Sequence, residues 1–244
     1  MLKKIFYFLV LSFLSSCNGS NIKEEVKTTD SAATGIVSTS VDTVKTIIPT
    51  PEDSIKRSEA EFEKLYTQVI KTLKTPEALD DINNYLDPEQ GLFIIYNPGA
   101  ITTCTILQST HDLDDSEGSP VIDFLTSFGK DMANAKDRNL ALQYSDQINI
   151  PLCEFNKRGT FVLSMDKPKP FLSKAFKQTQ EMIGADLDQA ELKKYLDIEK
   201  KLSKEVIINS FERDGEKYGK ILYFTKKNNQ WYLSGMNLAD CGAA

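Results

Sequence analysis

The sequence predicts an α+β fold, with helices toward the N-terminus and an antiparallel three-stranded meander at the C-terminus. Apolar residues recur at helical spacing between Ile55 and Leu73. Three β-rich runs follow near the other end of the chain, separated by the turn signals Asp214-Gly215 and Asn228-Asn229. Helical segments followed by consecutive strands are typical of α+β domains.

A single globular domain is expected over residues 51–244, and two helices open it. Thr50 suits the N-cap and Pro51 suits the first helical position. The apolar face of the first helix consists of Ile55, Phe62, Leu65, Tyr66, Val69, Ile70 and Leu73. Thr75-Pro76-Glu77 repeats the start signal and predicts a second helix up to Leu86, and residues 87–91 predict a turn.

Strands and helices alternate in the middle of the domain. Residues 91–96 (GLFIIY) and 101–107 (ITTCTIL) predict two strands. An acidic loop over 111–118 precedes a helix that begins at Ser119-Pro120. Residues 149–164 fit short strands and turns. Apolar spacing in 171–183 and 187–202 predicts two further helices, which separate near Gly184.

The three C-terminal strands are expected over 205–212, 218–226 and 230–238. Together with the preceding helices, this order resembles the cone-shaped folds of the nuclear-transport-factor or cystatin-like type. Folds of that type include enzymes and binding proteins, so the resemblance implies no particular function.

The N-terminus has the features of an export signal. Lys3 and Lys4 precede an apolar stretch over 5–14, which is shorter than the roughly 20 residues that a membrane-spanning helix needs. The stretch ends in Leu14-Ser15-Ser16-Cys17, which resembles the lipobox of bacterial lipoproteins. The resemblance implies that residues 1–16 are a cleaved signal peptide. It also implies that Cys17 becomes the N-terminus and carries acyl chains such as palmitate.

A lipidated Cys17 would anchor the chain to a membrane of the bacterial cell envelope. The residue after it is Asn18, where the inner-membrane lipoproteins of enterobacteria have aspartate. The nearest acids, Glu24 and Glu25, lie far from Cys17 for a surface-export signal. We therefore expect the outer membrane, with the domain facing the periplasm.

Residues 17–50 are expected to form a flexible tether. They are rich in Ser and Thr and contain no aromatic residue, so they cannot bury enough apolar surface to offset the entropy of ordering. Three tripeptides in or beside the tether resemble the O-glycosylation acceptors of exported Bacteroidetes proteins, which implies glycans at Ser31, Thr43 and Ser54. Ser54 also lies where the first helix is expected to start.

Charge and cysteine content narrow the range of partners. The formal net charge of −6 excludes nucleic acid as a favoured ligand, because phosphate contacts need Lys and Arg. Beyond Cys17 there are Cys104, Cys153 and Cys241, which predict one disulfide and one free thiol, or a disulfide to a partner. The chain has one histidine, His111, so a zinc site of Cys and His is not expected.

No set of residues predicts catalysis, a metal site or a cofactor. The acidic loop after His111 lacks the glycine that a calcium loop needs, since Glu117 occupies that position. Ser127 and Lys130 match the S-x-x-K motif of penicillin-recognising enzymes, but the other motifs are too close along the chain. Two function classes remain. The favoured one is a non-catalytic envelope protein that binds a ligand or partner, and the alternative is an envelope hydrolase with an unrecognised site.

The C-terminal strands are the expected binding region. Their aromatic residues include Tyr223 and Tyr232, and both faces of the strands carry large apolar groups. A sheet with one face in water would show a cleaner alternation. Helices of the domain could therefore cover both faces, or one face could line a pocket for a small ligand or a partner's peptide, with Tyr223 and Tyr232 in contact with it.

Overall fold

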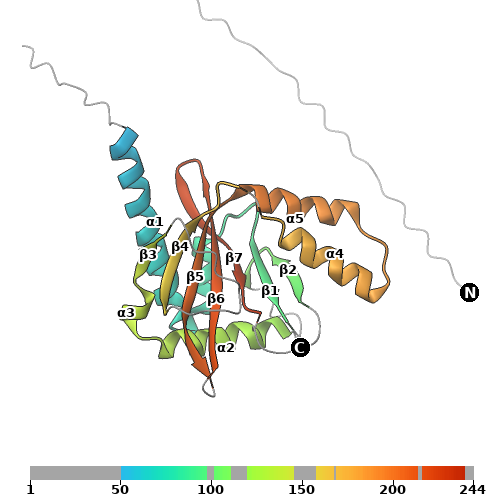
Figure 1. Ribbon diagram of the computed structural model, residues 1–244, viewed down its shortest axis with the longest axis horizontal. Helices are drawn as coiled ribbons and strands as arrows, with labels where there is room; N and C mark the ends of the chain where they lie inside the picture. The colour runs from blue at the N-terminus through green and yellow to red at the C-terminus, as the bar shows by residue number, and fades with distance from the viewer. Residues whose placement is uncertain are drawn as a thin grey trace, which may run out of the picture. The chain divides into compact units, whose positions relative to one another are not determined.

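A computed structural model describes residues 51–97, 102–110, 120–145, 158–167, 169–213 and 216–239 of the chain (Figure 1). In these ranges the chain forms one mixed sheet with helices on both faces. This arrangement confirms the predicted α+β class.

The described ranges contain six helical segments and a seven-stranded sheet. The helices are α1 (Pro51–Leu73), the 3-10 helix η1 (Pro76–Tyr85), α2 (Pro120–Asn134), α3 (Asp137–Leu140), α4 (Leu172–Ile183) and α5 (Gln189–Lys201). In the order of pairing, the strands are β2 (Thr103–Leu107), β1 (Leu92–Tyr96), β7 (Gln230–Asn237), β6 (Glu216–Lys227), β5 (Leu202–Arg213), β4 (Gly159–Ser164) and β3 (Leu142–Tyr144). Neighbouring strands are antiparallel, except that β1 is parallel to β7 and β3 is parallel to β4.

One face of the sheet packs against α1, η1 and α2. The predicted apolar face of α1 is buried from Phe62 onward except for Leu65, which is partly buried, whereas Ile55 in its first turns is 61% exposed. Phe62 packs edge-on against Phe224 of β6 and beside Trp231 of β7. The Trp231 indole N–H donates to the Ser58 carbonyl at 3.0 Å, so one aromatic side chain joins α1 to the sheet by packing and by a hydrogen bond.

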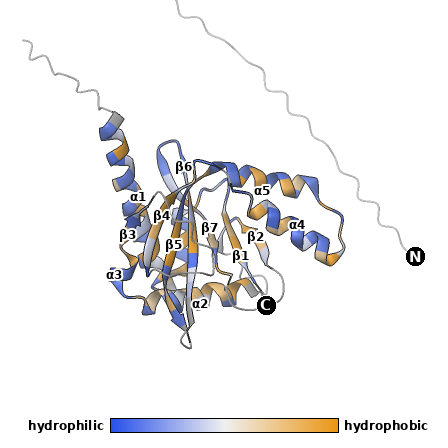
Figure 2. Cartoon of the chain, viewed as in Figure 1, coloured by the Kyte–Doolittle hydropathy of each residue, from blue (hydrophilic) through white to orange (hydrophobic). Residues whose placement is uncertain are grey.

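The other face packs against the hairpin of α4 and α5. Figure 2 shows the mixture of hydrophilic and hydrophobic residues along both helices, and their apolar residues Leu172, Tyr195 and Ile198 are buried against the sheet. Gly184 ends α4 in the left-handed conformation, with φ of 67°. Asp188 caps α5 by accepting from the N–H groups of Ala190 and Glu191.

A buried carboxylate joins the two helices of the hairpin. Glu199 of α5 is 3% exposed. It accepts hydrogen bonds from the backbone N–H groups of Phe171 and Ser173, at 2.7 and 3.0 Å, and from the Ser173 hydroxyl. These N–H groups lie at the start of α4, where backbone donors have no partner within the helix. Glu199 therefore caps α4 from the neighbouring helix.

Local predictions for the C-terminal strands agree with the structure, but their place in the sheet differs. Strands β5, β6 and β7 pair consecutively and antiparallel, and both turn residues Asn228 and Asn229 have positive φ. They form the middle of the larger sheet, because β1 adds to β7 and β4 adds to β5. Strand β3 was not predicted, since it is only three residues long and largely exposed.

The second predicted helix is present over Pro76–Tyr85, as a 3-10 helix with a kink at Ala78. Leu233 and Met236 of β7 both lie in the core beneath α1, although they are three residues apart and a regular strand would place them on opposite faces. The pairing between β6 and β7 shifts by one residue between Tyr223 and Phe224, and this bulge reverses the alternation along β7. No helix in the described part of the chain is long and apolar enough to span a bilayer.

Candidate functional site: a cleft between strand β2 and helix α5

The two tyrosines expected to bind a ligand have different surroundings. Tyr223 is 3% exposed and stacks on Phe171, with ring centroids 4.8 Å apart, while Phe93 packs beside it. Burial, together with nearby Glu205, raises the pKa of its phenol well above the ordinary value. Tyr232 is half-buried. Neither residue lines either of the clefts described below, so the geometry gives Tyr223 a packing role.

Most of the other residues singled out in the sequence lie outside the described residues. These are Cys17, Ser31, Thr43, His111, Cys153 and Cys241. Ser54 is described, and it lies exposed in the first turns of α1. Cys104 lies on β2 and forms no disulfide within the described ranges.

A cleft of about 540 Å³ lies between β2, α5 and the turn that joins η1 to β1. One wall follows the β2 segment and consists of Cys104, Thr105, Ile106 and Gln108. The other wall is a face of α5, with Glu191, Lys194, Tyr195, Asp197, Ile198 and Lys201. Asp87, Glu89 and Gln90 of the turn complete it. The volume is in the range of small-ligand sites in proteins.

A glycine allows the turn to reach the cleft. Gly91 has φ of +70°, and a Cβ atom on it would lie 2.2 Å from the carbonyl oxygen of Leu107 at the end of β2. A side chain here would collide with backbone that is fixed by pairing to β1. The absence of a side chain therefore brings the turn against β2 and places Gln90 in the wall of the cleft.

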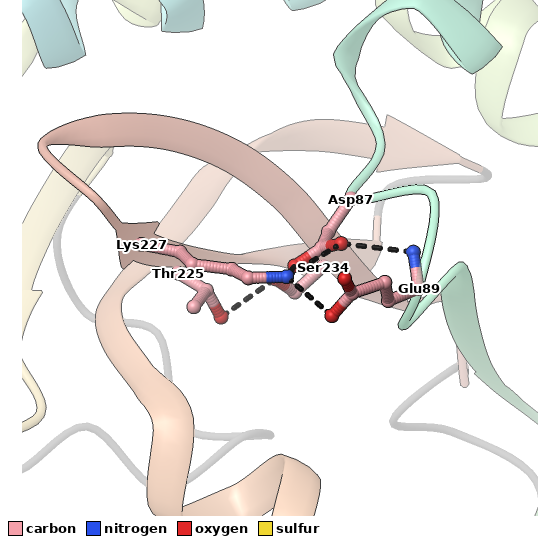
Figure 3. Close-up of polar contacts among 5 residues, drawn as sticks. All are labelled: Asp87, Glu89, Thr225, Lys227 and Ser234. Carbon is pink, nitrogen blue, oxygen red and sulfur yellow. Dashed lines mark hydrogen bonds and ion pairs between the residues drawn. The ribbon is translucent and has the colours of Figure 1, made fainter. Parts of the chain in front are cut away.

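An ion pair fixes the same turn to the β6–β7 hairpin (Figure 3). The Lys227 ammonium lies 3.0 Å from an Asp87 carboxylate oxygen and 2.7 Å from one of Glu89. Burial raises the pKa of Asp87, but the N–H bond from Glu89 and the Lys227 charge lower it by more, so the pKa is below the ordinary value. Asp87 is therefore ionised at neutral pH. Within the same hairpin the Ser234 hydroxyl donates to that of Thr225 at 2.7 Å.

Two protonatable groups, Cys104 on the β2 wall and Tyr195 on the α5 wall, are uncharged at neutral pH. The Tyr195 hydroxyl donates to the Cys104 carbonyl at 3.4 Å. Burial, and then the charges of Glu191 and Glu199, raise the pKa of the Cys104 thiol. Burial also raises the pKa of the Tyr195 phenol. A thiol with a raised pKa is a poor nucleophile at neutral pH because the thiolate is the reactive form.

Every carboxylate that lines the cleft has a lysine partner. Asp87 and Glu89 pair with Lys227, Glu191 pairs with Lys194, and Asp197 pairs with Lys193 and Lys200. A hydrolase built from two carboxylates needs one that acts as a base or nucleophile and one that acts as an acid. With these partners and Lys201, the cleft has five lysines for four carboxylates. This nearly balanced charge suits the recognition of an uncharged ligand better than acid–base chemistry between two free carboxylates.

Gln90 is the unusual polar group of the cleft. It is 9% exposed, and neither its side-chain oxygen nor its side-chain nitrogen has a hydrogen-bond partner among the described residues. Leaving a buried polar group unpaired typically costs about 1–3 kcal/mol. A ligand whose donor and acceptor reached this amide would recover that free energy, so Gln90 is a candidate recognition group that the sequence alone did not indicate.

A second, smaller cleft of about 270 Å³ lies at the end of α2. Its wall includes the exposed cations Lys136 and Arg138 and the Arg158–Glu212 ion pair. Arg158 adjoins the segment 146–157, which lies outside the described residues. The larger cleft, with its two long walls and its unpaired amide, is the better candidate for a binding site.

The described ranges contain no group of three or more His, Cys, Asp or Glu residues that could hold a metal ion. Comparison with known proteins found no matching family model, no matching curated protein and no matching solved structure. The cleft between β2 and α5 is therefore the feature from which a function can be proposed.

Proposed function

We propose that this chain is a lipid-anchored protein of the bacterial cell envelope whose globular domain binds a ligand in the β2–α5 cleft without changing it chemically. The observation that carries the proposal is the cleft of about 540 Å³ whose wall contains the buried, unpaired amide of Gln90. Such concave sites with a few fixed polar groups are the usual form of ligand-binding sites.

The cleft residues favour binding over catalysis. Their carboxylates are paired with lysines, and the raised pKa values of Cys104 and Tyr195 keep both groups protonated at neutral pH. Among the described contacts, the Cys104 thiol reaches only the Thr105 carbonyl, at 3.9 Å. No base of the cleft is therefore placed to accept its proton among these contacts. An activated nucleophile needs such a base or a lowered pKa.

The location of the protein is proposed from the N-terminal sequence. A lipobox-like motif at Leu14-Ser15-Ser16-Cys17 supports acylation at Cys17, and Asn18 after it supports the outer membrane, with the domain on the periplasmic side. Glycans are proposed at Ser31, Thr43 and Ser54. Residues 17–50 would then serve as the tether between the membrane and the binding domain.

Binding can be tested with a blocked cleft. Lys194 is exposed and lines the cleft, so Lys194→Trp should fill it, whereas Lys193→Trp adds the same bulk at an adjacent exposed position outside the lining. The probes are a panel of blocked tripeptides, monosaccharides and short fatty acids, and the readout is the shift of amide NMR signals of Thr105 and Gln108. We expect compounds that shift these signals in the parent and in Lys193→Trp but not in Lys194→Trp. If no compound does so, or if Lys194→Trp binds as the parent does, the cleft is not the binding site.

A further inference from the structure

We infer that the ligand of this cleft is a protein segment in extended conformation, which adds to the outer edge of β2 as a further strand. This inference rests on the proposed binding function of the cleft and specifies the class of ligand. Strand β2 is the outermost strand on its side of the sheet among the described residues. An edge strand offers unpaired backbone groups to another chain.

The backbone of β2 shows which of its residues face outward. Strand β1 lies between β2 and β7, and the Ile95 carbonyl accepts from Leu238 N–H on the β7 side at 2.7 Å. The residue opposite Ile95 in the β1–β2 pair is Cys104. In antiparallel pairs such opposed residues either bond to each other or both point away. Since Ile95 bonds toward β7, the backbone groups of Cys104 point away from β1.

Contacts from the helical hairpin support this orientation. The carbonyls of Thr102 and Cys104 accept from the hydroxyls of Thr179 on α4 and Tyr195 on α5, at 3.3 and 3.4 Å. Alternate residues of a strand point the same way, so the groups of Ile106 also face outward. Within the described residues no side chain of α4 or α5 bonds to the backbone of Ile106. Among the described residues, the hairpin therefore bonds to the first half of the edge and not to the half that contains Ile106.

The shape of the cleft fits an extended segment better than a compact ligand. Residues 104–106 and 108 line it along the strand, and the facing residues of α5 run from Glu191 to Lys201. At 1.5 Å per residue that helix face is about 15 Å long. An extended chain rises about 3.3 Å per residue, so the cleft would hold roughly four or five residues.

The walls also indicate which peptide side chains would fit. Ile106 of β2 and Ile198 of α5 form an apolar strip where the hairpin meets the strand, and ion pairs nearly balance the charges of the cleft. A bound strand would place alternate side chains on the apolar strip and the others toward solvent. We therefore infer a segment of alternating apolar and uncharged polar residues. Gln90 would pair with the backbone of one peptide residue, donating to its carbonyl and accepting from its N–H, because these two groups point to the same side in an extended chain.

The decisive probe is a blocked hexapeptide of alternating valine and threonine, with a lysine at each end for solubility. Two N-methylated forms serve as matched controls, one methylated at the valines and the other at the threonines. In an extended peptide the two sets of N–H groups point to opposite edges, so only one form keeps the donors that face β2. Calorimetric titration of the mature chain should show one form binding like the parent peptide and the other at least tenfold more weakly.

A pair of protein variants tests the same contact from the other side. Ile106→Pro removes the outward N–H of β2 and Ile106→Ala keeps it, while both remove the side chain. Proline is tolerated on an edge strand where its nitrogen faces outward. We expect the peptide to bind Ile106→Pro at least tenfold more weakly than Ile106→Ala, with unchanged Trp231 fluorescence confirming that both variants fold.

The outcomes separate this inference from the proposed function. Equal binding of the two N-methylated peptides, or equal affinities of the two Ile106 variants, overturns strand addition. So does the absence of hexapeptide binding at millimolar concentration when a sugar or fatty acid binds the cleft, a result that leaves the proposed function intact. If Lys194→Trp affects no ligand at all, the proposed function fails and this inference fails with it.

Discussion

Replacing Gly91 with alanine should destabilise the domain and distort the cleft, and Gly184→Ala provides a matched control. Both glycines adopt the left-handed conformation, with φ of +70° and +67°. A Cβ atom on Gly184 would meet nothing within 4 Å, whereas one on Gly91 would lie 2.2 Å from the Leu107 carbonyl oxygen. Both substitutions therefore carry the cost of an alanine in the left-handed conformation, and only Gly91→Ala adds a steric collision.

The expected magnitudes follow from that difference. A left-handed conformation costs an alanine about 1–2 kcal/mol, which is the expected loss for Gly184→Ala. Overpacking adds typically about 1–3 kcal/mol, and the Leu107 carbonyl cannot rotate away because β2 is paired to β1. The free energy of unfolding of Gly91→Ala should therefore fall by about 2–5 kcal/mol, a large fraction of the roughly 5–15 kcal/mol of a typical domain.

Urea unfolding monitored by Trp231 fluorescence measures both variants. Trp231 is the single tryptophan and is 8% exposed beside Phe62, so its emission reports the packing of α1 on the sheet. Amide signals of Thr105 and Gln108 would report the cleft separately. If the two variants lose the same stability, the close approach of the turn to β2 does not hold as described, and the position of Gln90 loses its explanation.

Three further outcomes are expected. Lys227→Met should lower stability at neutral pH. The folded-state pKa of Asp87 is depressed, so the stabilisation from its ion pair is present above the ordinary carboxyl pKa and is lost as pH falls through the depressed value. The difference in unfolding free energy between Lys227→Met and the parent should therefore disappear in acid, as measured by urea unfolding. Glu199→Ala leaves the N–H groups of Phe171 and Ser173 unpaired and should cost about 2–4 kcal/mol, while Glu199→Gln retains an acceptor and should cost less than half of that in the same assay. Finally, Cys17→Ala should convert a protein that partitions into detergent into a water-soluble one, when both are produced in the native host. Equal partitioning of the two forms, together with a mass that shows an unmodified N-terminus in the parent, would contradict the lipid anchor.

Local structure could be predicted where its signal is local. The separation of α4 from α5 follows from Gly184, whose left-handed conformation ends one helix, and from Asp188, whose side chain caps the next. The turn between β6 and β7 follows from Asn228 and Asn229, since both tolerate positive φ. Each of these features depends on residues a few positions apart, so composition and spacing were enough.

Features that depend on pairing between distant segments could not be predicted in the same way. The parallel pairing of β1 with β7 joins residues such as Phe93 and Gly235, and no short motif encodes it. The bulge near Tyr223 reverses the orientation of Met236, because one extra residue shifts a pattern with a period of two. The composition of residues 87–91 predicts a turn, but their contacts with Lys227 and Leu107 depend on how the sheet assembles.

The same assembly explains why recognition is expected at an edge of the sheet. Helices cover both faces, so the aromatic residues of the central strands, such as Tyr223 beneath Phe171, are used for packing. Within the described residues the sheet ends at β2 and at the three-residue strand β3, and the larger cleft lies along β2. Helix α5 contributes to both regions, because Ile198 lies in the core and also lines the cleft. A ligand that orders the edge of β2 should therefore also restrain α5, and hydrogen exchange along α5 should slow on binding while exchange along α1, on the opposite face, should not change.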